Sequence, residues 1–256
     1  MELRFADRVI VVTGAAGGIG TALCRRFCRS GGIVLGVDLS EAGLDRLKRE
    51  LAAEGLAVES RCGDLTSEDD VRNIFEWILA KYAAVHVLVN NAGLSTSLSS
   101  WKGQTGDGWN RVLEGNLRTT FLCTRAVLMP MIRQRYGRIV NMSSVTSVTD
   151  MEASFTELSY VAAKGGVNSF TRGLARQVGR HGITVNAILP GLVRTPMTEG
   201  LLDAEAGEEV IEGWISRCPR RRLGLPEDVA SLTAFLASEQ ADFITAQLIC
   251  VDGGFA

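Results

Sequence analysis

Seven short apolar runs rich in β-branched residues alternate with segments of helical periodicity, and this alternation constrains the fold more than any other feature. The runs cover residues 8–13, 33–38, 57–62, 85–90, 137–142, 182–188 and 247–252. Apolar side chains recur every three or four positions in the segments 18–30, 41–54, 67–82, 108–133, 158–180 and 226–237, which predicts helices. Apolar strands joined by helices run parallel, are covered on both faces and connect through right-handed crossovers. The pattern predicts an α/β protein with a doubly wound, seven-stranded parallel sheet of the Rossmann type, in a single domain over residues 1–256.

The composition argues against several classes of partner. A net charge of −2 gives no general attraction to nucleic acid or to an anionic membrane, so neither is expected as a partner. The six cysteines and two histidines are not spaced as in a zinc site, so no metal is expected. The apolar run near the N-terminus is too short for a signal peptide or a membrane span, and we expect a cytoplasmic protein.

A glycine-rich turn follows the first predicted strand. In TGAAGGIG (13–20) the glycines stand where a strand must turn tightly into a helix, and backbone N–H groups at a helix N-terminus suit a pyrophosphate. A tight turn without a ligand is the alternative. Asp38 ends the second strand eighteen residues after Gly20, close to the spacing at which a carboxylate binds the adenosine ribose. Asp38 would repel a 2′-phosphate, and no Arg or Lys stands at positions 15, 16 or 39, so NAD is favoured over NADP.

Tyr160 and Lys164 lie four positions apart in a predicted helix, so their side chains project from one face. A free tyrosine has a pKa of about 10 and needs a neighbouring cation to act as a base near neutral pH. We expect Lys164, together with the positive nicotinamide of an oxidised cofactor, to lower the phenol pKa. A structural Tyr/Lys pair on a helix surface is the alternative.

Four motifs in this order give the chain its resemblance to the short-chain dehydrogenase/reductase family: TGAAGGIG (13–20), NNAG (90–93), YVAAK (160–164) and PGLVRT (190–195). The resemblance covers nearly the whole chain. It implies that the cofactor contacts Gly14, Gly17, Gly18, Ile19, Gly20, Asp38, Leu39, Asp64, Leu65, Asn91, Ala92, Gly93, Tyr160, Lys164, Pro190, Gly191, Val193 and Thr195.

The same resemblance implies a catalytic set. Tyr160 would transfer the proton, and Lys164 would hold the cofactor ribose. Ser144 would bind the substrate oxygen, and Asn116 would anchor a water beside the lysine. Ser144 lies sixteen residues before Tyr160, whereas about thirteen is more common in similar proteins, so Ser143, Thr146 and Ser147 remain weaker candidates. Similar proteins pack the helices at 108–133 and 158–175 across a dimer axis, which implies a homotetramer.

These features together predict an NAD-dependent oxidoreductase that interconverts a small-molecule secondary alcohol and its ketone. The polar segments 95–100 and 144–158, with Asp150, Glu152 and Glu157, favour a polyol or sugar substrate, next to a lid at about 194–218. A hydrophobic alcohol or ketone is the next choice. The alternatives are an NADP-dependent carbonyl or 3-oxoacyl reductase, which Asp38 disfavours, and a nucleotide-binding regulator without turnover.

Overall fold

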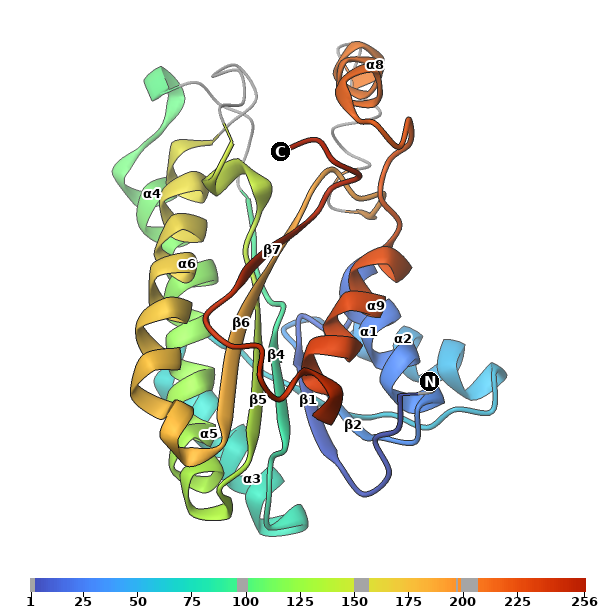
Figure 1. The fold of residues 1–256 in the computed structure, drawn as a ribbon, viewed down its shortest axis with the longest axis vertical. Coiled ribbons are helices and arrows are strands. Elements are labelled where there is room, and N and C mark those ends of the chain that lie inside the picture. Colours follow the sequence, from blue (N-terminus) through green and yellow to red (C-terminus); the bar gives the residue numbers. More distant parts are fainter. Residues whose placement is uncertain (1–2, 96–100, 150–156, 197, 199–206) are drawn as a thin grey trace.

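A seven-stranded sheet with the order β3-β2-β1-β4-β5-β6-β7 forms the centre of the molecule in a computed structural model, which describes residues 3–95, 101–149, 157–196, 198 and 207–256 (Figure 1). Every neighbouring pair of strands is parallel. The strands are β1 (Val9–Thr13), β2 (Ile33–Asp38), β3 (Glu59–Cys62), β4 (Val87–Asn90), β5 (Gly137–Met142), β6 (Ile183–Pro190) and β7 (Leu248–Val251). The predicted doubly wound sheet is therefore confirmed.

Helices cover both faces of the sheet, as the continuous apolar strands require. On one face lie α1 (Gly18–Arg29), α2 (Glu41–Ala53) and α9 (Pro226–Ala237), and on the other lie α3 (Glu68–Tyr82), α5 (Thr119–Gln134) and α6 (Leu158–Val178) (Figure 1). Strand β1 shows how the core divides, since Ile10 and Val12 belong to the first layer while Val9 and Val11 belong to the second. This alternation follows from the two-residue period of a strand.

The predicted helix at 108–133 is divided into three parts. It consists of α4 (Gly106–Leu113), a π-helical turn, η2 (Glu114–Arg118), and α5. Within that turn the Asn116 side chain donates from Nδ2 to the carbonyl oxygens of Val112 at 2.8 Å and Leu94 at 2.7 Å. A side chain that takes a helical carbonyl competes with the backbone ladder, which accounts for the widened turn.

The helices α4, α5 and α6 present apolar side chains at the surface. Phe121 is 43% exposed and packs edge-to-face on Phe170, and Trp109, Met129 and Leu158 are also exposed. Leu122 and Val167 of the same helices are buried. Within the described residues, no helix has the length and hydropathy needed to cross a lipid bilayer.

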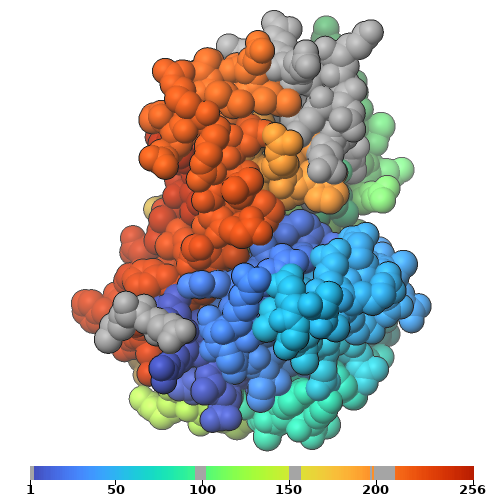
Figure 2. Space-filling model, turned by 90° about the vertical axis from the view of Figure 1, so that its right-hand side faces the viewer, coloured from blue at the N-terminus to red at the C-terminus, as the bar shows by residue number. Residues whose placement is uncertain are grey.

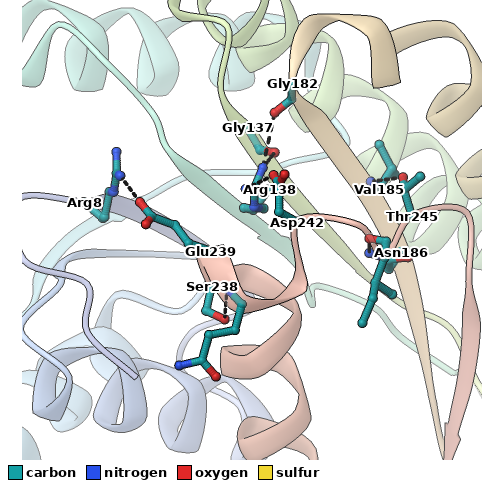
Figure 3. A network of polar contacts seen from close by, with 12 residues as sticks. Arg8, Gly137, Arg138, Gly182, Val185, Asn186, Ser238, Glu239, Asp242 and Thr245 are labelled. Carbon is teal, nitrogen blue, oxygen red and sulfur yellow. Dashed lines mark hydrogen bonds and ion pairs between the residues drawn. The ribbon is translucent and has the colours of Figure 1, made fainter. Parts of the chain in front are cut away.

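A network of ion pairs and hydrogen bonds ties together the amino ends of the strands, opposite the ends where a ligand is expected (Figure 3). Arg138 of β5 is almost completely buried and donates to Asp242 at 2.7 Å and to the Gly182 carbonyl at 3.2 Å. Arg8 pairs with Glu239 in the same region. These contacts fasten the segment between α9 and β7 to the central strands.

Segments near the end of the chain extend the molecule beyond the carboxyl edge of the sheet. Helix α8 (Gly207–Arg217) projects there, and the space-filling view shows its orange surface at the upper end of the molecule (Figure 2). Trp214 of α8 stacks on Phe255 with ring centres 3.7 Å apart and planes within 2°. The lid predicted at 194–218 is described only in part, since residues 197 and 199–206 lie outside the described residues.

Candidate active site

One cavity of about 270 Å³ opens at the carboxyl ends of β1, β2, β4, β5 and β6, where parallel sheets bind their ligands. Most of the predicted site residues line it. They are Gly14, Gly17, Gly18, Ile19, Gly20, Asp38, Asn91, Ala92, Gly93, Ser144, Tyr160, Lys164, Pro190, Gly191, Val193 and Thr195. Residues that are distant in the sequence thus meet in one place because their strands end at the same edge.

The glycine-rich loop forms the floor of the cavity, and its glycines are sterically required. Gly14 has a positive φ of 63°, and a Cβ on Gly20 would lie 2.0 Å from the Gly14 carbonyl oxygen. A Cβ on Gly18 would lie 2.9 Å from Cγ2 of Thr195, across the cavity. Since Gly17 caps α1 and has no side chain, the first amides of this helix face the cavity without a side-chain cap. This arrangement fits a pyrophosphate.

Thr13 fixes this loop to the end of β4. Its hydroxyl oxygen accepts hydrogen bonds from the backbone N–H groups of Asn91 and Ala92, both at 3.0 Å, and donates to the Val89 carbonyl at 3.3 Å. The Asn91 side chain returns from β4 and donates to the Thr13 and Gly14 carbonyls at 3.0 Å. The two loops therefore form one rigid unit.

The carboxylate of Asp38 lies at one end of the cavity. Its oxygens accept from the N–H groups of Ala16 at 3.0 Å and Ser40 at 3.0 Å, which orients the side chain beside the glycine-rich loop. Arg46 of α2 also reaches this loop and donates to the Ala16 carbonyl at 3.1 Å. The sequence argument against a 2′-phosphate considered positions 15, 16 and 39. It did not include Arg46, whose approach to the glycine-rich loop depends on how α2 packs.

Lys164 lies on the other side of the cavity and is almost completely buried. Its Nζ donates to the Met142 carbonyl at 2.9 Å and lies 5.3 Å from the centre of the Tyr160 ring. Burial lowers the pKa of Lys164 from 10.5 to about 8, because a charged ammonium loses hydration there. The predicted adjacency of the two side chains is present.

The phenol of Tyr160 does not have the lowered pKa that the sequence suggested for the complex with an oxidised cofactor. In the protein alone, burial raises the pKa of Tyr160 to about 12, and the negative charge of Glu157 adds to this rise. The Ser144 hydroxyl acts in the opposite direction. No positive charge of the described residues is among the causes that set the pKa of this phenol, so the effect of burial prevails. The expected lowering of the pKa relied on Lys164 together with a bound pyridinium.

Two neighbouring serines at the end of β5 have different environments. Ser143 donates to the Lys164 carbonyl at 3.0 Å, so its hydroxyl is engaged with the α6 backbone. Ser144 accepts from the Thr146 hydroxyl at 2.9 Å and faces the phenol of Tyr160. Ser147 contacts Asn168, which donates to it from Nδ2 at 2.8 Å. This geometry favours Ser144 over its neighbours as the serine nearest the phenol, in line with the preference drawn from the sequence.

Asn116 is buried behind the cavity and does not line it. The two hydrogen bonds of its Nδ2 fix the amide, while its Oδ1 has no partner among the described residues. A Cβ on Gly93 would lie 2.6 Å from this Oδ1 and 3.2 Å from Nζ of Lys164. A buried acceptor beside an ammonium is the kind of site that an ordered water satisfies.

Three other predicted residues lie away from the cavity. Leu39 is 70% exposed, Leu65 belongs to the core beside α3, and Asp64 accepts hydrogen bonds from Thr66. Conversely, the cavity is also lined by three residues for which no cofactor or catalytic role was predicted, Met142, Pro196 and Thr198. Ser143, a weaker candidate for the catalytic serine, lines it as well. Met142 contributes its carbonyl to Lys164, a role that no side-chain pattern reveals. The described residues contain no cluster of His, Cys, Asp and Glu able to hold a metal.

The chain is similar over nearly its full length to a family model and to several curated proteins. A family model described as enoyl-(acyl carrier protein) reductase matches residues 14–256. The 3-oxoacyl-[acyl-carrier-protein] reductase FabG of Thermotoga maritima is 37% identical over 98% of this chain and 99% of that protein. Nodulation protein G of Rhizobium sp. strain N33 is 36% identical over 99% of this chain and 98% of its own length.

Solved structures show the same likeness in three dimensions. Levodione reductase superposes with a TM-score of 0.92 at 32% identity, covering 98% of each chain. A second structure, that of gox2181, gives a TM-score of 0.93 at 31% identity, covering 99% of this chain and 97% of that one. The matched residues, the fold and these relatives agree, and the chain belongs to the short-chain dehydrogenase/reductase family.

Proposed function

We propose that this protein is an NAD-dependent oxidoreductase that interconverts a secondary alcohol and its ketone. The observation that carries the proposal is the convergence of Tyr160, Lys164 and Ser144 at one end of a cavity whose other end holds the Asp38 carboxylate. The glycine-rich loop lies between Asp38 and the three catalytic candidates, and it fits a dinucleotide pyrophosphate. The family supports an oxidoreductase that uses a nicotinamide cofactor.

Each residue of the cavity has a separate task in this proposal. A bound nicotinamide would accept hydride from the alcohol carbon or deliver it to the ketone carbon. Tyr160 takes the hydroxyl proton during oxidation and returns it during reduction, and Ser144 hydrogen-bonds the substrate oxygen. Lys164 binds the ribose, and its ammonium favours the phenolate. Asn116 holds a water next to Lys164, for which its unpartnered Oδ1 is suited.

The choice of NAD rests on Asp38. A carboxylate that two backbone N–H groups hold beside the loop accepts ribose hydroxyls and repels a 2′-phosphate. A second candidate is an NADP-dependent 3-oxoacyl-thioester reductase. Two observations favour it: the name of the Thermotoga relative, and the position of Arg46, whose guanidinium lies beside the same loop and could meet a phosphate.

For the substrate we propose a polyol or sugar. Both polar segments that suggested it are incompletely described, because residues 96–100 and 150–156, with Asp150 and Glu152, lie outside the described residues. The described end of the first segment, Ser95, carries a hydroxyl near α6.

Titration of the protein with NAD and with NADP, followed by tryptophan fluorescence, tests the cofactor. We expect tighter binding of NAD, whereas tighter binding of NADP would favour the thioester reductase. Assays with polyols, sugars, cyclic ketones and a 3-oxoacyl thioester test the substrate. Tyr160→Phe should bind NAD as the wild type does but lose at least about a hundredfold in turnover. Equal rates for the two proteins would reject Tyr160 as the proton-transfer residue.

A further inference from the structure

A buried carboxylate lies one helical turn before Tyr160. Glu157, at the N-cap position of α6, is only 4% exposed. The Ser95 hydroxyl donates to its Oε2 at 2.7 Å, and the Ser159 hydroxyl donates to its Oε1 at 2.9 Å. Because both serines donate and each carboxyl oxygen accepts, these hydrogen bonds match the ionised form of Glu157.

The sequence context of Glu157 suggested a place beside the substrate, together with Asp150 and Glu152, and those two residues lie outside the described residues. Glu157 is absent from the residues that line the cavity, and its oxygens accept hydrogen bonds from two serines. Its charge therefore acts on the cavity through a neighbouring side chain. The three-residue spacing places Glu157 and Tyr160 on the same side of the first turn of α6, and the negative charge of Glu157 acts on the phenol.

We propose that Glu157 is a positioning residue of this active site, whose buried negative charge acts on the neighbouring Tyr160 phenol and thereby shifts the pH range of the reaction. The inference rests on the proposed function for its consequence in catalysis. It assigns Glu157 no contact with the substrate.

The chemistry gives this charge a defined consequence. In ketone reduction, a bound reduced nicotinamide would supply hydride to the carbonyl carbon and become oxidised, while the carbonyl oxygen takes the proton of Tyr160 and solvent reprotonates the phenolate. Alcohol oxidation is the reverse and needs the phenolate at the start. Glu157 therefore extends full-rate reduction to higher pH and shifts the onset of oxidation to higher pH as well. Both limbs move together, because the same phenol governs both directions.

The groups around Tyr160 support this assignment. Burial and the charge of Glu157 raise the pKa of the phenol, and the Ser144 hydroxyl, from the end of β5, lowers it. On α6 itself, Nζ of Lys164 lies 5.3 Å from the ring centre but is directed to the Met142 carbonyl. Among these groups, Glu157 is the one acidic side chain, so removing its charge changes the balance in one direction.

The direct test is a phenolate titration by ultraviolet absorbance after a rapid pH jump, before alkaline unfolding begins. The chain has only three tyrosines, so subtracting the spectrum of Tyr160→Phe isolates Tyr160. We expect Glu157→Gln to lower the pKa of this phenol by about one pH unit. Glu157→Asp retains the charge and should titrate close to the wild type. Glu76→Gln, which removes an exposed charge on α3, is the matched control and should cause no shift.

A second readout uses the pH profiles of alcohol oxidation and ketone reduction. In Glu157→Gln both limbs should move to lower pH by about one unit, and in Glu157→Asp they should stay in place. An unshifted phenol in Glu157→Gln, or equal shifts in the Gln and Asp variants, would overturn the role of Glu157. Failure of the proposed function has a different signature, because the phenol would still shift while no substrate of the panel was turned over.

Discussion

The buried ammonium of Lys164 should make the stability of the cofactor-free protein depend on pH in an unusual range. Burial lowers the pKa of Lys164 from 10.5 to about 8, which corresponds to about 3 kcal/mol between the charged and neutral forms. Because the pKa is lower in the folded state, this contribution to stability is present above 10.5 and is lost as the pH falls to 8. At neutral pH the folded protein therefore bears nearly the whole cost.

Lys164→Met removes that cost and also removes the hydrogen bond to the Met142 carbonyl, which contributes about 1 kcal/mol. At about pH 7 we expect the variant to be more stable than the wild type by about 2 kcal/mol. The advantage should shrink by about 2 kcal/mol at about pH 9.5, because the wild-type lysine is then largely neutral in the folded state. Urea unfolding of both cofactor-free proteins, at one fixed protein concentration, measures this difference.

Lys48→Met serves as the control, since Lys48 is exposed on α2 and pairs with Asp45 at the surface. It should follow the wild-type pH dependence. Parallel stability curves for Lys164→Met and the wild type between these two pH values would refute the reasoning. So would a variant that is destabilised equally at both, since that result would mean that packing rather than charge dominates at position 164.

Three further predictions concern other parts of the fold. Gly20→Ala should lower the melting temperature and abolish NAD binding in a fluorescence titration, because its Cβ would lie 2.0 Å from the Gly14 carbonyl oxygen. Unchanged binding would contradict the assignment of the pyrophosphate to the glycine-rich loop. Nδ1 of His86 accepts a hydrogen bond from the Val9 N–H, and burial, followed by the charge of Arg8, lowers the pKa of His86. The contribution of His86 to stability is therefore present above pH 6.5 and is lost as the pH falls through the lowered pKa. His86→Asn should show a weaker loss of melting temperature at acidic pH, and an identical loss would exclude His86 as the cause. We also propose that the exposed surface around Phe121 forms the contact of a homotetramer; Phe121→Glu should reduce the mass observed in sedimentation, and an unchanged mass would place the contact elsewhere.

The sequence predicted those parts of the site that depend on local chain geometry. The glycine-rich loop could be recognised because tight turns and helix N-termini need particular residues, and the close backbone approach at Gly14 and Gly20 follows from that requirement. Tyr160 and Lys164 could be paired because helix periodicity alone makes them neighbours. Asp38 and Asn91 could be placed at one edge of the sheet because the carboxyl ends of parallel strands meet there.

Properties that depend on packing between distant segments could not be predicted. The rise in the Tyr160 pKa results from burial, which no spacing of residues reveals. The orientation of the Asn116 amide depends in part on its hydrogen bond to the Leu94 carbonyl, which is twenty-two residues away in the chain. The contacts of Glu157 and Arg46 could not be predicted because their partners, Ser95 and the Ala16 carbonyl, come from other elements.

The hydroxyl of Thr13 has a consequence for anyone who redesigns this protein. A hydroxyl has one proton and two lone pairs, and the Thr13 oxygen uses all three on Val89, Asn91 and Ala92. Valine would fill the same space yet leave the Ala92 amide without its acceptor and the Asn91 amide with only the Val89 carbonyl, so serine is the conservative replacement and valine is not. A library aimed at new substrates should leave this position unchanged, because this one oxygen atom, which does not line the cavity, joins the glycine-rich loop to the end of β4.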